Sequence, residues 1–223
     1  MAIGVLKQLS HGLQWATETL ARLSARTDRA PIDSVDRMFS FVSTRSALIG
    51  QKKLYGYLKE RIGMRYPTMF EDPEFGRSIQ AANIQVFAAG LADMTVFAVA
   101  HATAGRETAS TARIALAEAC YHSGLDDNAN WATREQLANW RKAFGVRAEK
   151  TVWDNVAAGA NPFFESPKAL IRWAPISDDH KKYDREIVEN SMRFAWNEVT
   201  QDYRRRVDGA AIVRDWLSSP AGS

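Results

Sequence analysis

Glu118 and His122 are a pair of side chains whose spacing suits chemistry. They lie four residues apart in a stretch predicted to be helical, so both project from one face of the helix. A carboxylate and an imidazole placed in this way can ligate a metal, as helix-borne Glu and His do in di-iron bundles. Those bundles use two Glu-x-x-His motifs, whereas this sequence has none. We therefore interpret the pair as a polar contact and expect no metal site.

A loop that partly resembles a calcium site follows the same stretch. Residues 126–130 read Asp-Asp-Asn-Ala-Asn, which reproduces the first, third and fifth positions of an EF-hand loop. The remaining positions do not match, because Trp131 stands where the loop needs glycine and Leu137 where it needs a bidentate glutamate. We therefore predict a joint between two helices here and not a calcium site.

Cys120 lies between Glu118 and His122 and is the only cysteine in the sequence. A catalytic thiol needs a neighbouring base and a lowered pKa, and neither is visible in a sequence. A buried cysteine in an alanine-rich helix is the simpler interpretation. Because a single cysteine cannot form an intramolecular disulfide, we expect a reducing compartment and a cytoplasmic localisation.

Asp93 and His101 are polar residues in the most apolar stretch, residues 86–104. A buried acid or imidazole must find a partner or shift its pKa. Eight helical residues separate the two side chains by about 12 Å, so they do not pair with each other. An enzyme hypothesis would require Asp93, His101, Glu118 and His122 to converge on one interior polar pocket. The sequence contains no nucleophile elbow, phosphate-binding loop, dinucleotide-binding loop or HExxH motif to support it.

The elements that position these residues are predicted to be helices throughout. Prolines are absent between residues 73 and 162 and between 175 and 220, and no alternating strand pattern occurs. We predict an all-α protein: an amphipathic helix and linker at residues 1–30, then a single multi-helix domain of about six or seven helices at residues 31–223. The first predicted helix spans residues 2–26. Ser34 is predicted to cap a helix that runs to about Ile62, interrupted or bent near Gly50 or Gly56, and Thr133 and Gln136 are predicted to form a capping box that opens a helix to about Phe144. Ser166 is predicted to cap a short helix that starts at Pro167 and ends at Trp173. The other predicted helices are 79–103, 108–123 and a long helix that is capped at Ser177 and includes Val207, and residues 64–78 are predicted to be a loop.

The two apolar segments are not predicted to cross a membrane or to direct secretion. The first helix places Leu6, Leu13 and Leu20 on one stripe, as in a helix that docks on a protein or a membrane surface. It lacks the apolar core and cleavage site of a secretory signal. For residues 86–104, the unfavourable free energy of inserting a central Asp93 into a membrane roughly cancels the favourable free energy of inserting the apolar residues. We therefore expect a buried core helix and no transmembrane segment.

Positive charge is concentrated in the first third of the sequence, although the net charge is only +3. Residues 37–65 contain seven basic residues and one acidic residue, Glu60, with aromatic residues between them. Such a surface is typical of contact with an acidic protein, an anionic membrane or nucleic acid, although a solvated helix face has the same composition. The candidate binding residues are Arg45, Lys52, Lys53, Tyr55, Lys59, Arg61 and Arg65.

A second candidate binding surface is aromatic. Trp153, Phe163, Phe164 and Trp173 cluster around two prolines, and we predict that they form a non-helical elbow. Tryptophan anchors many protein interfaces, so the elbow is a candidate contact for a partner. The same residues also occur in ordinary helical cores.

These observations favour a non-enzymatic interaction protein, an adaptor or assembly factor. We expect it to bind an acidic protein or an anionic membrane through its basic N-terminal third, with a protein partner or a second copy of itself and without a cofactor. The alternatives are a small helical enzyme with an interior polar pocket and a nonspecific nucleic-acid binder. The last is less favoured, because no DNA-recognition motif is present.

Overall fold

The protein divides into two compact units, Met1–Ala30 and Pro31–Ser223. The computed structural model describes residues 28–63 and 72–219, so the fold concerns the second unit. Three sequence predictions lie wholly or partly outside the described residues: the amphipathic helix at residues 2–26, the binding residue Arg65, and residues 64–71 of the predicted loop.

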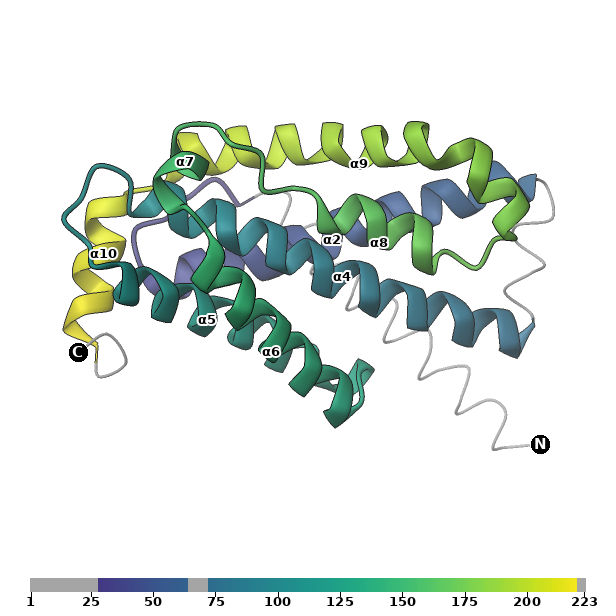
Figure 1. The fold of residues 1–223 in the computed structure, drawn as a ribbon, viewed down its shortest axis with the longest axis horizontal. Helices are drawn as coiled ribbons and strands as arrows, with labels where there is room; N and C mark the ends of the chain where they lie inside the picture. Colours follow the sequence, from purple (N-terminus) through teal and green to yellow (C-terminus); the bar gives the residue numbers. More distant parts are fainter. Residues whose placement is uncertain (1–27, 64–71, 220–223) are drawn as a thin grey trace. The chain divides into compact units, whose positions relative to one another are not determined.

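The described part of the chain is all-α, as the sequence predicted. It contains eight α-helices and a short 3₁₀ turn, with no strand among the residues described. Figure 1 shows their arrangement. The helices are α2 (Val35–Ile62), α4 (Pro73–Ala102), α5 (Ser110–Asp126), α6 (Arg134–Lys150), α7 (Trp153–Ala157), α8 (Glu165–Trp173), α9 (Asp178–Arg206) and α10 (Gly209–Ser218), with the 3₁₀ turn at Ala129–Trp131.

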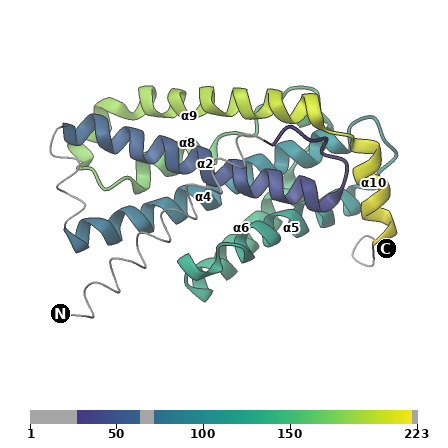
Figure 2. The same ribbon diagram turned by 180° about the vertical axis from the view of Figure 1, so that it is seen from behind.

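Helix α4 is the centre of the domain and contacts every other α-helix described. Helix α2 packs along one side of it, which Figure 2 shows from behind. Every residue from Leu91 to Ala100 is buried. Within the described residues, α4 alone has the length and composition of a membrane span. However, 83% of its most apolar window is buried against other helices, as in a protein core.

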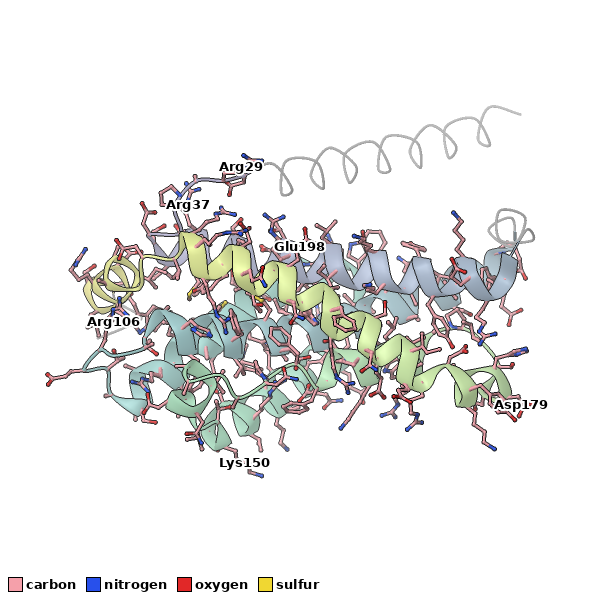
Figure 3. The ribbon with its side chains drawn as sticks, turned by 90° about the horizontal axis from the view of Figure 1, so that it is seen from above. Arg29, Arg37, Arg106, Lys150, Asp179 and Glu198 are labelled. Atoms are coloured by element: carbon pink, nitrogen blue, oxygen red, sulfur yellow. The ribbon has the colours of Figure 1, made fainter. Side chains whose placement is uncertain are left out.

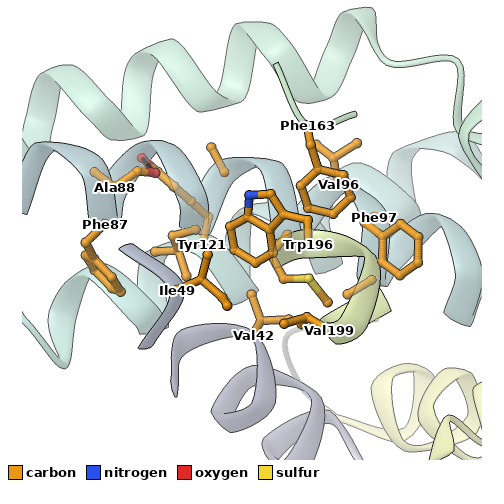
Figure 4. Close-up of a cluster of buried hydrophobic side chains, with 14 of the residues drawn as sticks. Val42, Ile49, Phe87, Ala88, Val96, Phe97, Tyr121, Phe163, Trp196 and Val199 are labelled. Atoms are coloured by element: carbon orange, nitrogen blue, oxygen red, sulfur yellow. Dashed lines mark hydrogen bonds between the residues drawn. The ribbon is translucent and has the colours of Figure 1, made fainter. Parts of the chain in front are cut away.

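The aromatic core lies where α2, α4 and α9 meet. Figure 4 shows Trp196 of α9 among side chains of α2 and α4. Phe163 stacks on Trp196 with ring centroids 4.9 Å apart. The Tyr203 hydroxyl donates to the Ala98 carbonyl at 3.0 Å, so its polar atom is satisfied without water. Complete burial of such large side chains contributes the main stabilising free energy of the domain.

Two helix starts agree with the sequence patterns that predicted them. The Ser34 side chain accepts a hydrogen bond from the Arg37 amide at the start of α2. Thr133 and Gln136 form both hydrogen bonds of a capping box at the start of α6, at 2.9 and 3.1 Å. Local side-chain chemistry is therefore sufficient to start these helices.

Other predicted boundaries were wrong. Helix α4 begins at Pro73, so residues 73–78 are helical and not part of a loop; Asp72 caps the helix through the Glu74 amide, and proline occupies its first turn. Helix α6 continues to Lys150, beyond the predicted end near Phe144.

The predicted interruption of α2 and the predicted extent of α9 also need correction. Helix α2 runs through Gly50 and Gly56 without a break. Gly50 faces α4, and a Cβ there would lie 3.5 Å from Val86. The final predicted helix ends at Arg206, since Val207 forms an isolated parallel bridge with Ile32. The chain then continues as α10.

Candidate functional site: a groove between α6 and α8

A groove of about 260 Å³ lies over α4, between α6 and α8. We call it the α6–α8 groove. In Figure 1, α8 and α6 lie on opposite sides of α4. The groove is lined by Gln85, Ala88, Ala89 and Ala92 of α4, Tyr121 of α5, Trp140, Ala143, Phe144 and Arg147 of α6, and Glu165, Lys168, Ala169, Arg172 and Trp173 of α8.

The floor of the groove is formed by Gln85 and three alanines of α4. Gln85, Ala88, Ala89 and Ala92 have the spacing of one helix face, so they line about two turns of α4. Alanine is a good helix former and projects no atom beyond Cβ. Ala88 and Ala92 are buried and Ala89 is partly exposed, so a partner can approach α4 closely at Ala89.

Aromatic side chains form the walls. Tyr121 and Phe144 stack at the back with ring centroids 4.1 Å apart and planes 14° apart. The Tyr121 hydroxyl donates to the Ala88 carbonyl at 3.4 Å, which fixes the ring. Trp140 is half-buried and Trp173 is 39% exposed, so both offer apolar surface at the rim. The groove is therefore apolar inside.

The charged side chains of the groove are mainly cationic. Lys168 and Arg172 of α8 are exposed, whereas Arg147 is half-buried. Glu165 is the one acidic residue in the lining. Because Arg147 pairs with Glu165 and with the buried Asp93, Lys168 and Arg172 supply the positive charge of the groove. Two exposed cations favour a ligand with negative charge next to an apolar surface.

Arg147 connects the groove to a buried polar cluster. Its Nη1 lies 2.9 Å from Asp93 Oδ1 and 3.2 Å from Glu165 Oε1. Its Nη2 donates to the Pro162 carbonyl at 2.8 Å, and the Phe164 ring covers the guanidinium at 4.4 Å. These contacts hold Arg147 in one orientation, so it forms a fixed part of the groove wall whose charge is balanced by Asp93 and Glu165.

Asp93 acts as a helix cap supplied by another helix. Its carboxylate accepts hydrogen bonds from the amides of Glu165 at 3.4 Å and Ser166 at 2.8 Å, the first two residues of α8. The Ser166 hydroxyl donates to the same carboxylate at 2.7 Å and accepts from Trp196 Nε1 at 2.9 Å. A chain of hydrogen bonds thus joins α4, α8 and α9.

The prediction that Ser166 would cap α8 ahead of Pro167 was wrong. Helix α8 begins at Glu165, and Ser166 lies inside its first turn. The free amides at the start of α8 are satisfied by Asp93, 72 and 73 residues away in the sequence. Burial raises the pKa of Asp93 to about 6, although Arg147 and Ser166 both act to lower it.

The four residues of the enzyme hypothesis do not converge on one cavity, and none of them lines the groove. Asp93 faces α6 and α8, as described above. The His101 ring packs against the Phe97 ring with centroids 4.2 Å apart and planes tilted by 51°, and it lies beside Arg204. Burial, followed by the charge of Arg204, lowers the pKa of His101 to about 4.

Glu118 and His122 lie near α6, whereas His101 lies beside Arg204 of α9. Glu118 Oε1 would be 2.9 Å from a Cβ at Gly145, which places it against α6. Burial and Arg141 lower the pKa of His122. No group of three His, Cys, Asp or Glu side chains in the described residues is arranged to hold a metal.

The contacts of Cys120 and of the calcium-like loop indicate that both have structural roles. Cys120 is buried next to Thr95, and burial raises the pKa of its thiol to about 12, which disfavours the reactive thiolate. In the loop, the Asn128 amide donates to the Gly124 carbonyl, and Asp126 pairs with Arg141 of α6. The segment joins α5 to α6.

Several basic candidates in residues 37–65 bind α9. Arg45 is buried and lies 3.4 Å from Asp202. Lys53 donates to Ser191 at 2.8 Å. Arg61 forms an ion pair with the buried Asp184.

The other α2 candidates differ in exposure. Lys52 and Lys59 are exposed, and Tyr55 is half-buried. Asp184 also accepts from the Tyr57 hydroxyl at 2.8 Å. Several of the basic side chains of α2 therefore connect α2 to α9 within the domain.

The aromatic elbow has helical ends, contrary to the prediction. Trp153 lies in α7 and Trp173 ends α8, while Phe163 and Phe164 lie at or beside the start of α8. Trp153 and Phe163 are buried, whereas Phe164 is 45% exposed. Phe164 covers Arg147 and Trp173 lines the groove, so two of the four predicted aromatic residues lie at this site.

Sequence reasoning missed the groove because its residues come from four helices. One signal was present, since Ala88, Ala89 and Ala92 form a stripe of small residues, but burial explains that stripe equally well. A search of family models, curated proteins and solved structures finds no match to this chain.

Proposed function

We propose that this protein is a non-enzymatic interaction protein. Its α6–α8 groove binds an amphipathic helix of a partner protein, which has an apolar face with acidic side chains beside it. The observation that carries the proposal is the combination of an alanine floor, aromatic walls and a cationic rim in one open groove. This function retains the acidic protein partner expected from the sequence. It moves the main contact from α2 to α6 and α8.

The size of the groove favours a helix lying on it over an enclosed small ligand. Its volume of about 260 Å³ is below the range of roughly 300–1,000 Å³ typical of small-molecule sites. It accepts a few apolar side chains from one face of a helix. Recognition of this kind uses anchors spaced at three and four residues along the bound helix.

Charge complementarity defines the polar part of the partner. Lys168 and Arg172 lie four residues apart on α8 and are both exposed. Carboxylates flanking the apolar anchors would meet these two cations. Arg147 is already paired with Asp93 and Glu165, so we assign it to positioning the wall.

Binding is measured with labelled helical peptides of about three turns, each with leucines on one face. One peptide carries glutamates beside the leucines and the other carries lysines. We expect the acidic peptide to bind the full chain and the basic peptide to bind at least tenfold more weakly. Ala89→Trp fills the floor of the groove and should abolish binding.

The charge-reversed pair K168E/R172E should weaken binding of the acidic peptide at least tenfold. A matched control, K52E/K59E, reverses two exposed charges on α2 and should change affinity less than twofold. The proposal is contradicted if the α2 variant loses binding and the α8 variant keeps it. It is also contradicted if anionic vesicles are bound and the acidic peptide is not.

A further inference from the structure

Helix α9 carries an apolar stripe that no described residue covers. Tyr183, Ile187 and Phe194 are 78%, 73% and 72% exposed. At about 100° per residue their directions fall within about 40° of one another, so they form one line on the helix. Figure 3 looks down on this helix from above, with Asp179 and Glu198 labelled near the two ends of the stripe. Large exposed apolar residues in a line mark an interaction site.

We propose that this stripe is a dimer interface, in which α9 packs antiparallel against α9 of a second copy of the chain. A two-fold axis near residue 189 places Tyr183 opposite Phe194 of the other copy, because both lie about equally far from the axis. Ile187 then lies near its own symmetry mate. The same patch is thus complementary to itself, which a two-fold interface requires.

The charges beside the stripe fit this arrangement. Glu186 and Arg193 lie seven residues, about two turns, apart on the same flank of the stripe. In a two-fold antiparallel pair, like flanks meet, so Glu186 of one copy faces Arg193 of the other, and the contact occurs twice. Within one chain Arg193 bonds Glu189 and Asn190, which leaves further N–H groups for a partner carboxylate.

The dipole of α9 favours the same arrangement. The first turn of the helix holds Asp178 and Asp179, and its last turn holds Arg204, Arg205 and Arg206. Lys181 pairs with Asp178 and Lys182 follows it, so the start of the helix carries little net charge. Antiparallel packing opposes the dipoles of the two helices, whereas parallel packing would align them.

The dimer should be weak, since the stripe spans only about 17 Å of helix between Tyr183 and Phe194. Such a patch is at the low end of stable interfaces. None of the residues lining the α6–α8 groove belongs to α9. The dimer therefore does not rest on the proposed function, and each copy would keep its groove open.

The first test measures mass against concentration for the full chain by sedimentation. We expect a reversible shift from 24.9 kDa toward twice that mass as concentration rises. Phe194→Glu should leave only the monomer. Glu186→Arg and Arg193→Glu should each raise the dissociation constant at least tenfold, and the double variant E186R/R193E should restore it to within about threefold.

Oxidative crosslinking tests the direction of the helices. Asn190→Cys lies beside the axis and should crosslink to its own mate. Tyr183→Cys lies about 18 Å from its mate, measured along the helix, and should not crosslink to it. The native Cys120 is buried and should not contribute.

Three results would overturn the dimer. The chain could stay monomeric at the highest concentration, as it would if another segment or a membrane covered the stripe. The Phe194→Glu variant could still dimerise. Tyr183→Cys could crosslink in preference to Asn190→Cys, which would indicate parallel helices.

Discussion

Asp93 offers a test of the buried cluster through a single substitution, Asp93→Asn. The carboxylate is fully buried, pairs with Arg147 and accepts the first amides of α8. Asparagine has nearly the same shape and keeps one acceptor oxygen. Asparagine carries no negative charge and cannot take up the proton that the Asp93 carboxylate binds.

The sign and size of the effect follow from the pKa of Asp93, which burial raises from its ordinary value of 3.8 to about 6. Between these two values the folded protein retains a proton that the unfolded chain has released. The free energy of unfolding therefore falls as pH rises through this window. At about 1.4 kcal/mol per pH unit, the contribution of Asp93 is about 3 kcal/mol, all of which is lost by pH 7.

The assay is urea denaturation of both proteins at pH values from 3.5 to 7.5, followed by tryptophan fluorescence. His101 acts in the opposite direction, because its pKa is lowered to about 4 and the folded protein then binds fewer protons than the unfolded chain. Both proteins contain His101, so its contribution cancels when they are subtracted. The stability of the original protein minus that of Asp93→Asn should fall by about 3 kcal/mol between pH 3.5 and 7.5.

A second variant sharpens this test. Ser166→Ala removes the hydroxyl that bonds Asp93 and leaves the carboxylate in place. The pKa of Asp93 should then rise further, so the fall in stability should extend to higher pH. The reasoning is refuted if the difference between the original protein and Asp93→Asn increases with pH. That sign would mean that Arg147 and the α8 amides stabilise the carboxylate more than burial destabilises it.

Three further substitutions and one chemical reaction test the packing. Gly209→Ala should lower the free energy of unfolding by about 2–3 kcal/mol in thermal or urea unfolding, because the added Cβ would lie 2.3 Å from the Ala102 carbonyl oxygen of α4. Gly56→Ala should raise it by about 1 kcal/mol, because no atom lies within 4 Å of the added Cβ and alanine favours the helix over glycine. Asp184→Ala should cost about 2–3 kcal/mol, since it leaves a buried tyrosine hydroxyl and a half-exposed arginine without their carboxylate; an unchanged urea midpoint would contradict this. Cys120, whose thiol pKa burial raises to about 12, should react with a chromogenic disulfide only as fast as the protein unfolds, and rapid labelling of the folded protein would argue against its burial.

The sequence predicted those parts of the fold that depend on neighbouring residues. The cap at Ser34 and the capping box at Thr133 are local, and both occur where the pattern indicated. The start of α4 was missed although Asp72 and Pro73 are also a local signal, because the prolines around it suggested a loop. The end of α9 at Val207 depends on Ile32, a contact between distant residues that no local pattern contains.

The candidate site was predicted only in part, for the same reason. Phe164 and Trp173 were selected as aromatic residues near prolines, and the fold brings them to Arg147 and the groove. Asp93 was recognised as needing a partner, but its partners lie 54 to 73 residues away. The sequence around Asp93 gives no information about these distant partners, so the contact with the start of α8 could not be predicted.

The most direct test of groove binding is an NMR titration of the full chain with the acidic helical peptide. The indole N–H signals of Trp140 and Trp173, both in the groove lining, report on the site. Trp131 is 45% exposed and lies outside that lining, so it is the internal control. We predict that the first two signals shift together and saturate while that of Trp131 stays in place. Shifts at Trp131 alone, or at the amides of Lys52 and Lys59 with both groove indoles unmoved, would contradict the proposed function.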